Sequence, residues 1–311
     1  MTGLTAYRRS DGGIGVRNYL FTLPTVVCAN QVVVDVALTH PELKYIEHQH
    51  GCAQIGADLE QTRRIFTQLA LHPNVYASMF VSLGCEGVVA TKLFANAAAQ
   101  TDRPMDLVVI QASGGTPGAE ARVDAWIDQR QRELDRCQRE TAGWDELVVG
   151  VLIDSSVASK LELVRACLES LQELGVRIVI PNAYLHLAEE LAGAVGTVDY
   201  GESADERVWA MKPGSNALET TTGLTAAGAH LIVHLADRPH AFGSPLAPTI
   251  RWCMDETTYQ KFRDDFDGQL QSVHDVQQVT EQLASIANGH PTVAESFGMD
   301  DFALYRIGPT V

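Results

Sequence analysis

The feature that most constrains the fold of this 311-residue chain is an alternation of short, β-rich apolar runs with amphipathic stretches. In the first half the candidate strands are 19–28, 44–49, 75–85 and 105–113, and helical periodicity fills the gaps between them. The alternation resumes with LVVGVLID and continues through RIVIPN and AAGAHLIVHLA. Strands separated by helices form parallel sheets with helices on both faces. The sequence therefore predicts an α/β fold with mainly parallel sheets.

The chain is also predicted to form two lobes. Its length suffices for one large hydrophobic core or two smaller ones, because single cores stop growing near roughly 250–300 residues. The best candidate for a boundary is the charged, glycine-containing stretch at 141–146, which follows a long polar helix near 119–140. We therefore expect an N-terminal α/β lobe over 1–143, which carries a candidate metal site, and a C-terminal α/β lobe over 144–311, which contributes substrate contacts.

Charge and cysteine content narrow the class of function. The formal charge is −16 and the pI about 4.9, so the surface would repel nucleic acid and anionic lipid. The N-terminus has no apolar signal segment, and no apolar run approaches the roughly 18–20 residues that span a bilayer. The six cysteines include no CxxC pair, which favours thiols or metal ligands over disulfides. These features predict a cytoplasmic protein without nucleic-acid or membrane partners, and its class is often homo-oligomeric.

Donor side chains gather where the predicted strands end. Open parallel sheets bind ligands beyond the carboxyl ends of their strands. Taken singly, each donor has a simpler explanation, because a strand-end cysteine is usually a small buried apolar group and an HxH pair can mark one exposed face. Together they predict a ligand site. The donors that follow the first three strands are Cys28, then His48, His50 and Cys52, then Cys85 and Glu86.

These donor types leave the metal open. Imidazole and thiolate suit iron, zinc or copper, whereas a carboxylate would also suit Mn²⁺ or Mg²⁺. Three cysteines could alternatively hold an iron–sulfur cluster with one open iron. The chain has no zinc-finger spacing and no HExxH, so no standard zinc motif is present. It also has no GxSxG, no Walker loop and no GxGxxG after a strand, and the lack of the last two argues against nucleotide chemistry.

Several segments together resemble one family, the altronate and galactarate dehydratases with their sulfolactate sulfo-lyase relatives. The matching segments are YRRSDGGIGVRNYL with TLPTVVCAN, HQHGCAQIGAD, HPNVYASMFVSLGCE and MKPGSN…TTGLTAAGAHLIVHLADRPHAFGSPLAPTI. The resemblance implies a metal-dependent lyase that removes water, or sulfite in the sulfo-lyases, from a hydroxy acid bearing a carboxylate. It also implies Fe²⁺ as the first choice of cofactor, with Mn²⁺ or Mg²⁺ as alternatives, and a large subunit that works with a separate small subunit.

One departure from the family bears on turnover. Relatives carry a Cys-Gly-Gly-Ser-Asp stretch after the strand that opens the second lobe. Here Leu152, Ile153, Asp154, Ser155 and Ser156 stand in place of its glycines, serine and aspartate. Three hypotheses therefore remain: a hydro-lyase of sugar-acid type, a sulfo-lyase large subunit acting on a sulfonated hydroxy acid, and a non-catalytic paralogue that keeps the fold.

The hydro-lyase hypothesis assigns roles to particular residues. A histidine suits the general base, and we expect His50 or His48 in that role, with orientation of the site as the alternative for His48. Around the metal we expect His50, Cys52, Cys85 and Glu86, with Cys28.

Substrate contacts are expected elsewhere in the chain. Arg17, beside Asn18, can bind a carboxylate with two hydrogen bonds, or form only a surface salt bridge. Lys212 and Arg238 lie in matching segments and are expected to hold the distal end of a sugar acid. His234 and His240 flank the same loop, and core or surface roles are expected for them.

Overall fold

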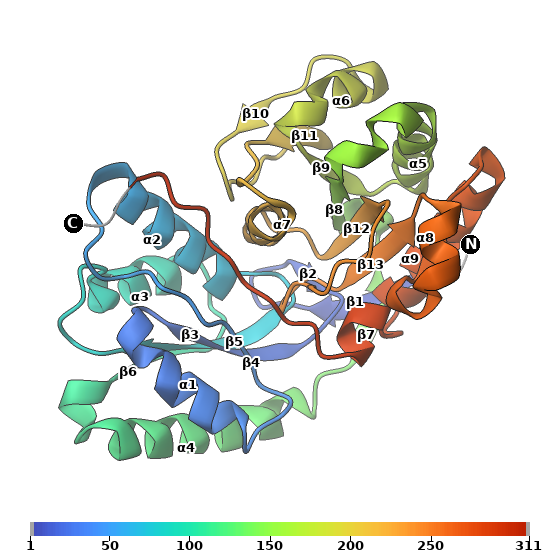
Figure 1. Cartoon of the computed structure of the whole chain (residues 1–311). Helices are drawn as coiled ribbons and strands as arrows, with labels where there is room; N and C mark the ends of the chain where they lie inside the picture. Colours follow the sequence, from blue (N-terminus) through green and yellow to red (C-terminus); the bar gives the residue numbers. More distant parts are fainter. Residues whose placement is uncertain (1–2, 309–311) are drawn as a thin grey trace. The chain divides into compact units, whose positions relative to one another are not determined.

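The computed structural model describes residues 3–308, except the side chains of residues 155, 158 and 159. It divides into two compact units (Figure 1). The N-unit comprises residues 7–139 and 302–308, and the C-unit comprises residues 3–6 and 140–301. Neither unit is one continuous stretch of chain, because the first residues belong with the second half and the last ones with the first half.

The chain passes between the units after residue 6, within β1, and after residue 139, at the start of β7. Both strands belong to a small sheet of order β2-β1-β7. Its strands are β1 (Leu4–Arg8), β2 (Ile14–Gly15) and β7 (Arg139–Ala142). The two larger sheets, one in each unit, are parallel throughout and carry helices, so the predicted α/β class is confirmed.

The N-unit is built on a four-stranded sheet of order β4-β3-β5-β6. Its strands are β3 (Tyr19–Pro24), β4 (Lys44–Tyr45), β5 (Val75–Ser82) and β6 (Met105–Val109). Helices α1 (Asn30–Ala37) and α4 (Thr116–Leu134) cover one face, and α2 (Gly56–Ala70) and α3 (Ala90–Ala98) cover the other (Figure 1). Burial on both faces explains why β3 and β5 read as continuous apolar runs.

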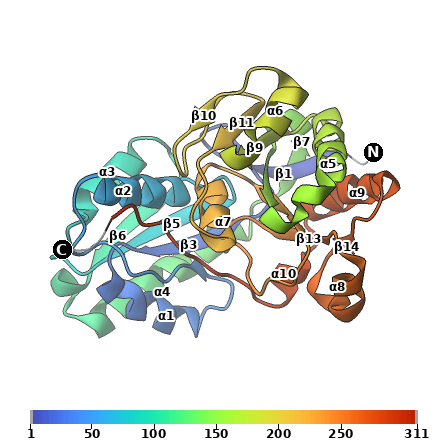
Figure 2. The same ribbon diagram turned by 45° about the horizontal axis from the view of Figure 1, so that its top comes forward.

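The C-unit is built on a seven-stranded sheet of order β10-β11-β9-β8-β12-β13-β14. Figure 2 labels its two outermost strands, β10 and β14. Its strands are β8 (Val148–Ile153), β9 (Arg177–Pro181), β10 (Thr197–Val198), β11 (Val208–Met211), β12 (Leu231–Ala236), β13 (Thr249–Cys253) and β14 (Gly268–Gln269). Its helices are α5 (Leu161–Leu174), α6 (Leu185–Ala192), α7 (Ala217–Ala226), α8 (Glu256–Lys261), α9 (Val276–Ala287) and α10 (Val293–Ser296).

In each large sheet, the chain adds strands first on one side of a starting strand and later on its other side. In the N-unit the chain leaves β3 for β4 on one side and later returns to add β5 on the other. In the C-unit it leaves β8 for β9 on one side and later adds β12 on the other. Ligands of open α/β sheets bind in the crevice at the carboxyl ends of such strand pairs. The β3/β5 and β8/β12 ends are therefore the places to look for a site.

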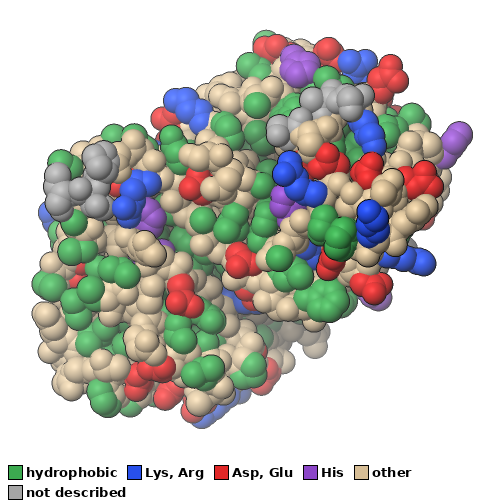
Figure 3. Space-filling model, viewed as in Figure 1, with side chains coloured by type: hydrophobic (Ala, Val, Ile, Leu, Met, Phe, Trp, Pro, Cys, Tyr) green, Lys and Arg blue, Asp and Glu red, His purple; other side chains and the backbone are tan. Residues whose placement is uncertain are grey.

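Acidic and basic side chains are scattered among uncharged ones on the face drawn in Figure 3. A small anion would therefore depend on local positive charge rather than on a broad field. Within the part of the chain that is described, no helix has the length and apolar character needed to cross a membrane.

Candidate functional site

The HQHGC segment, residues 48–52, lies at the carboxyl edge of the N-unit sheet. Predicted strand 44–49 is only two residues long, so the segment forms a turn beyond β4. The Val27 N–H donates to the His50 carbonyl at 3.0 Å, and the Val88 N–H donates to the Gly51 carbonyl at 3.1 Å. These bonds tie the segment to the turns that follow β3 and β5.

Close backbone approach in this segment requires glycine. Gly51 has φ +92°, and a Cβ there would lie 2.2 Å from the Thr25 carbonyl oxygen. Ala53, with φ 55°, is the one non-glycine residue at positive φ in the described chain. Left-handed backbone at an alanine is uncommon and marks local strain. The strain concentrates beside Cys52.

His48 is fully occupied by its neighbours. Its Nε2 donates to the Pro24 carbonyl at 2.6 Å, and its Nδ1 accepts from the His50 N–H at 3.1 Å. The ring also packs on Phe66, with centroids 4.7 Å apart. Burial lowers the pKa of His48 to about 4, so the ring is neutral at pH 7. With both nitrogens engaged, the geometry favours an orienting role over a basic one.

His50 can release a nitrogen for proton transfer. The Gln54 carbonyl is fixed by the Gly51 N–H at 2.8 Å, so its amide nitrogen faces three acceptors. These are Asp58 Oδ2 at 2.6 Å, Thr62 Oγ1 at 2.9 Å and His50 Nδ1 at 3.2 Å. An amide has only two hydrogens, so the longest contact, to His50, is the one that can be given up.

The charge state of His50 suits a proton acceptor. Burial, followed by the positive charge of Arg306, lowers the pKa of His50 to about 4. The ring also hydrogen-bonds to the backbone at Leu304, and its Nδ1 faces the Gln54 amide. At neutral pH the ring is therefore an unprotonated base.

A cavity of about 420 Å³ adjoins the two histidines. One wall is the segment 302–306, which the Arg306 guanidinium anchors by donating to the Gln49 carbonyl at 2.9 Å. The Tyr305 carbonyl accepts from Gln61 at 2.6 Å, which also holds this segment on α2. The lining residues are Asn30, Glu47, His48, Gln49, His50, Phe302, Ala303, Leu304 and Arg306.

Glu86 joins the ends of β3 and β5. Its Oε1 accepts hydrogen bonds from Thr25 at 2.9 Å and from Ser82, and its Oε2 accepts from the Gly84 N–H at 2.7 Å. Burial alone would raise the pKa of Glu86, but these hydrogen bonds outweigh it and the pKa lies below its ordinary value. The carboxylate is ionised and already fully hydrogen-bonded.

The three predicted cysteine ligands are free thiols, and all are exposed. Cys28, Cys52 and Cys85 lie on three separate turns at this edge, because β3 ends at Pro24 and β5 at Ser82. They do not form, with His50 and Glu86, a compact donor group of the kind that holds a single ion. In the described residues that kind of group occurs once, in the C-unit. The predicted N-unit metal ligands stay a prediction.

Arg17 and Asn18 lie at the opposite, amino end of β3. Six residues at about 3.3 Å each separate the two ends by about 20 Å. The Asn18 side-chain oxygen accepts from Arg9, whose guanidinium also donates to the Arg17 carbonyl at 2.7 Å. The structure therefore does not bring this predicted substrate pair to His50.

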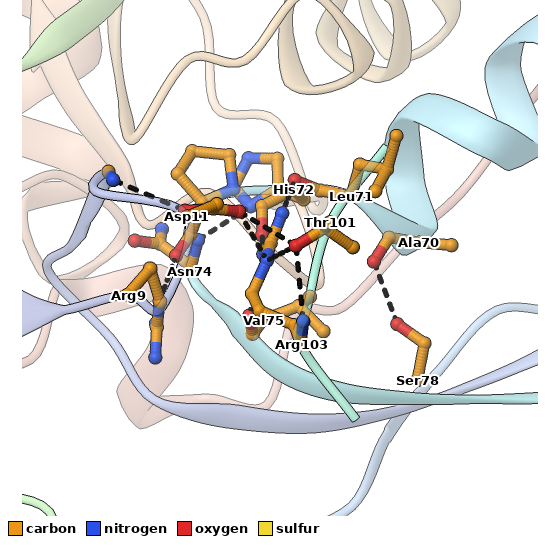
Figure 4. Close-up of polar contacts among 12 residues, drawn as sticks. Arg9, Asp11, Ala70, Leu71, His72, Asn74, Val75, Ser78, Thr101 and Arg103 are labelled. Atoms are coloured by element: carbon orange, nitrogen blue, oxygen red, sulfur yellow. Dashed lines mark hydrogen bonds and ion pairs between the residues drawn. The ribbon is translucent and has the colours of Figure 1, made fainter. Parts of the chain in front are cut away.

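The same end of the sheet carries a structural network (Figure 4). Arg103 pairs with Asp11 at 3.0 Å and donates to the carbonyls of His72 and Val75 at 2.8 and 2.9 Å. Asn74 accepts the Val16 N–H at 2.9 Å. These contacts fix the turn before β3 to the turn before β5.

In the C-unit, Asp154 directly follows β8 and is 6% exposed. Its Oδ1 lies 3.1 Å from Nε2 of His234, which is in β12, and its Oδ2 lies 2.8 Å from Nε2 of His240. Predicted substrate residue Arg238 places its Nε 3.9 Å from the same Oδ2, while its side chain is 59% exposed. The other predicted residue, Lys212, is 61% exposed and pairs with Asp199.

The carboxylate of Asp154 is charged. Burial would raise its pKa, but hydrogen bonds from His234 and His240 outweigh that effect, so the pKa lies well below its ordinary value. Burial lowers the pKa of His234 more than Asp154 raises it. Because His234 Nδ1 has no hydrogen-bond partner in the described structure, the neutral ring with its proton on Nε2 is the form that avoids a buried, unpaired N–H.

Aromatic packing and a buried arginine fix the imidazoles. Phe242 stacks on His234 with centroids 5.7 Å apart and meets His240 edge-on at 5.2 Å. Arg251, paired in register with His234 across β12 and β13, is 0% exposed and donates to the His240 carbonyl. Arg251 in β13 thus holds the loop that carries His240 in place.

Several residues here were missed by sequence reasoning. His234 and His240 were expected in core or surface roles, and Asp154 had no role. Arg306 and Gln54 were not singled out either. Asp58 and Thr62 do show a signal, since their i, i+4 spacing places them on one face of α2, whereas Gln54 precedes that helix.

Comparison with known proteins matches both halves of the chain. A family model described as D-galactarate dehydratase/altronate hydrolase, second domain, matches residues 6–135. A second, described as D-galactarate/altronate dehydratase, C-terminal, matches residues 191–310. Together they match most of the chain.

Curated relatives point the same way. Altronate dehydratase of Escherichia coli K12 is 36% identical over 90 residues, which cover 26% of this chain and 18% of that protein. Altronate dehydratase of Bacillus subtilis 168 is 35% identical over 91 residues, with the same coverage. The matches thus span less than a fifth of the length of these dehydratases.

Other similarities are more distant. The (2R)-sulfolactate sulfo-lyase subunit beta of Chromohalobacter salexigens is 22% identical, over 97% of this chain and 96% of that protein. A solved S. aureus MnaA–UDP structure aligns with a TM-score of 0.31 and 10% identity, over 92% of this chain and all of that one, which is too low to inform fold or function. On the strength of both family models, the chain belongs to the D-galactarate dehydratase/altronate hydrolase family.

Proposed function

We propose that this protein is a lyase that eliminates water from a carboxylate-bearing hydroxy acid of the sugar-acid type, with a divalent metal as cofactor. The observation that carries the proposal is the N-unit cavity, where an unprotonated His50 and the positively charged Arg306 adjoin one space at the β3/β5 edge. The family supplies the class of reaction. A small partner subunit and a cytoplasmic location belong to the same proposal.

Arg306 is the proposed anchor for the substrate carboxylate. A guanidinium suits a carboxylate because its N–H groups match the two oxygens. The bound anion would offset the positive charge that depresses the pKa of His50. Substrate binding would therefore make His50 a stronger base at the moment it is needed.

His50 is the proposed general base. Its Nδ1 takes the proton from the carbon next to the carboxylate, while the Gln54 amide keeps its bonds to Asp58 and Thr62. The C–H electron pair forms the new C=C bond as the C–O bond at the neighbouring carbon breaks. The protonated ring can return its proton to the departing hydroxyl, so that water leaves and an enol remains, which becomes a ketone.

The metal would supply charge that stabilises the electron-rich carboxylate during proton removal. The N-unit donors do not fit a single ion as placed, because Glu86 is saturated and the thiols lie on separate turns. The proposed proton transfer therefore uses His50 and Arg306 and no metal at the N-unit edge. Cys52, Cys85 and Cys28 remain proposed ligands for an iron–sulfur cluster, whose thiolates stand further apart than those around one ion.

Elimination of sulfite is a second candidate. The sulfo-lyase subunit aligns with nearly the whole chain, whereas each dehydratase aligns with 26% of it. Both reactions remove a leaving group β to a carboxylate, so the same base and anchor serve either. A sulfonated substrate would carry a second strong anion.

The test is a product assay on the full chain purified without oxygen. Sugar acids and sulfonated hydroxy acids are offered with Fe²⁺, Mn²⁺ or Mg²⁺, and keto-acid and sulfite are measured. His50→Gln should lower kcat by about 10²–10⁴-fold, the usual contribution of a general base. His40→Gln, which removes a histidine near Glu42 and Asp124, is the matched control.

The outcomes separate the candidates. Keto-acid with or without sulfite identifies the leaving group. Full activity in His50→Gln contradicts the assigned base. Saturable binding of a sugar acid without product, for every substrate and metal, would support the non-catalytic paralogue.

A further inference from the structure

We propose that Asp154, His234 and His240 form a divalent transition-metal site in the C-unit, at the β8/β12 edge of the seven-stranded sheet. The site lies far along the chain from the cysteine-rich edge where sequence reasoning expected a metal. Its metal binding does not depend on the proposed lyase activity, so it can be tested without a substrate.

The donor atoms are already gathered. One carboxylate oxygen and one nitrogen from each ring lie within 4.8 Å of one another. Asp154 Oδ1 to His234 Nε2 is 3.1 Å, and Asp154 Oδ2 to His240 Nε2 is 2.8 Å. Each contact is now bridged by a hydrogen that a cation can replace. At His234 the ring proton would move to Nδ1, which has no partner in the described structure, so metal binding has to offset the cost of one buried, unpaired N–H.

The chemistry of this set selects the ion. Two imidazoles and one carboxylate suit Fe²⁺, Zn²⁺ or Mn²⁺, whereas Mg²⁺ and Ca²⁺ prefer oxygen ligands. Three protein ligands leave coordination positions open, as in catalytic rather than structural sites. Oxygen groups of a hydroxy acid could occupy those positions.

Three contacts preorganise the ligands. Phe242 packs on both rings, at 5.7 and 5.2 Å between centroids. Arg251, wholly buried, bonds to the His240 carbonyl, and the Tyr184 hydroxyl donates to the Asp154 carbonyl at 3.3 Å. Backbone and ring positions are thus set before any ion arrives, which reduces the cost of binding.

Two positive charges lie near the site, and of these Arg251 is wholly buried and fixed whereas Arg238 can move. Arg238 approaches Asp154 Oδ2 at 3.9 Å but is 59% exposed and also lies 3.6 Å from Asp237. Its side chain can turn toward solvent or toward an anion bound on the metal. This ion pair is weak enough for a divalent cation to displace, because its two atoms lie 3.9 Å apart and the guanidinium is mostly in solvent.

Cobalt substitution tests the site directly. The full chain is stripped with chelator and titrated with Co²⁺, whose visible absorption reports nitrogen and oxygen coordination. We expect one equivalent to bind in wild type and to compete with Zn²⁺. Asp154→Asn and His240→Gln should each weaken binding by more than roughly 100-fold, because even groups outside the ligand shell contribute 10–100-fold.

Two matched variants guard the assignment. His40→Gln removes a histidine near two N-unit carboxylates, and Cys52→Ser removes a predicted N-unit ligand. Both should bind Co²⁺ as wild type does. His240 lies on a loop and is partly exposed, so its variant tests the site even if Asp154→Asn fails to fold.

Loss of the Co²⁺ spectrum in Cys52→Ser, with retention in His240→Gln, would overturn the proposal. So would a spectrum dominated by sulfur-to-metal charge transfer. A normal spectrum in a protein without lyase activity would refute the proposed function alone, and lyase activity without any C-unit metal would refute this site alone.

Discussion

The turns at the β3/β5 edge and those at the β8/β12 edge are held in place by different kinds of contact. At β3/β5 in the N-unit, turns are held by backbone hydrogen bonds, a glycine pressed against a carbonyl and a left-handed alanine. At β8/β12 in the C-unit, one ionised carboxylate is held by two imidazoles. The first edge is organised by its main chain and the second by side chains.

The difference extends to charge. His48 and His50 at the N-unit edge each have a pKa near 4 and are neutral at pH 7, and the Glu86 carboxylate there already accepts hydrogen bonds from neutral donors. Asp154, by contrast, keeps donors that a cation could replace. An edge with neutral imidazoles and a strained backbone suits proton transfer, whereas an edge with a charged carboxylate between two imidazoles suits a metal.

Gly51→Ala should break the N-unit edge. A left-handed alanine costs about 1–2 kcal/mol, and a backbone clash adds about 1–3 kcal/mol. We expect a loss of about 2–5 kcal/mol in the free energy of unfolding, measured with urea. Gly56→Ala, at φ +57° with nothing within 4 Å of a Cβ, is the control and should cost only the first contribution. Equal losses in the two variants would show that the Thr25 contact does not matter.

Acid should weaken the N-unit edge before it discharges Asp154. His48 has a pKa of about 4 in the folded chain against 6.5 in an unfolded one, so the unfolded chain protonates first as pH falls. Stability from this residue is complete above pH 6.5 and is lost toward pH 4, in total on the order of 3 kcal/mol. Asp154, with its pKa below the ordinary value, stays charged throughout that window.

Urea unfolding at several pH values between 7 and 4 measures this slope. His48→Asn should reduce the slope, because asparagine has no ionisable group. An unchanged slope in this variant would contradict the assignment of a buried, neutral His48.

Ala53→Gly should give the smallest effect, a gain of about 0.5–1 kcal/mol in the free energy of unfolding. Glycine relieves a left-handed backbone but adds entropy to the unfolded chain, so only part of the strain is recovered. Ala95→Gly, in the exposed interior of α3, should instead lose about 1 kcal/mol. Destabilisation by both changes would mean that Ala53 is not strained.

The sequence predicts more of the functional residues at the N-unit edge than at the C-unit edge. Strand–helix alternation predicted the α/β class, and strand ends drew attention to His50 and Cys52 because local pattern suffices there. The Asp154 cluster was missed because it depends on β8 lying beside β12, and strand order leaves little trace in sequence. His234, inside an apolar strand, resembles a core residue.

Part of the N-unit cavity could not be predicted, because it depends on contacts between residues far apart in the sequence. Arg306 meets Gln49 across 257 positions, and no local pattern links the two. The substrate contacts predicted for Arg17 and Asn18 rest on a matching segment and stay a prediction, and the direction of β3 puts both residues at its amino end, away from His50. Direction is visible only once the sheet is known.

The return of residues 302–306 to the N-unit has a consequence for synthesis of the protein. His48 and His50 leave the ribosome about 250 residues before the wall that covers them, which at roughly 5–20 residues per second is a delay of about 10–50 s. Throughout that delay the cavity beside His48 and His50 is without the wall that residues 302–306 provide. A nascent chain paused after residue 301 would therefore be the form most open to capture by a chaperone.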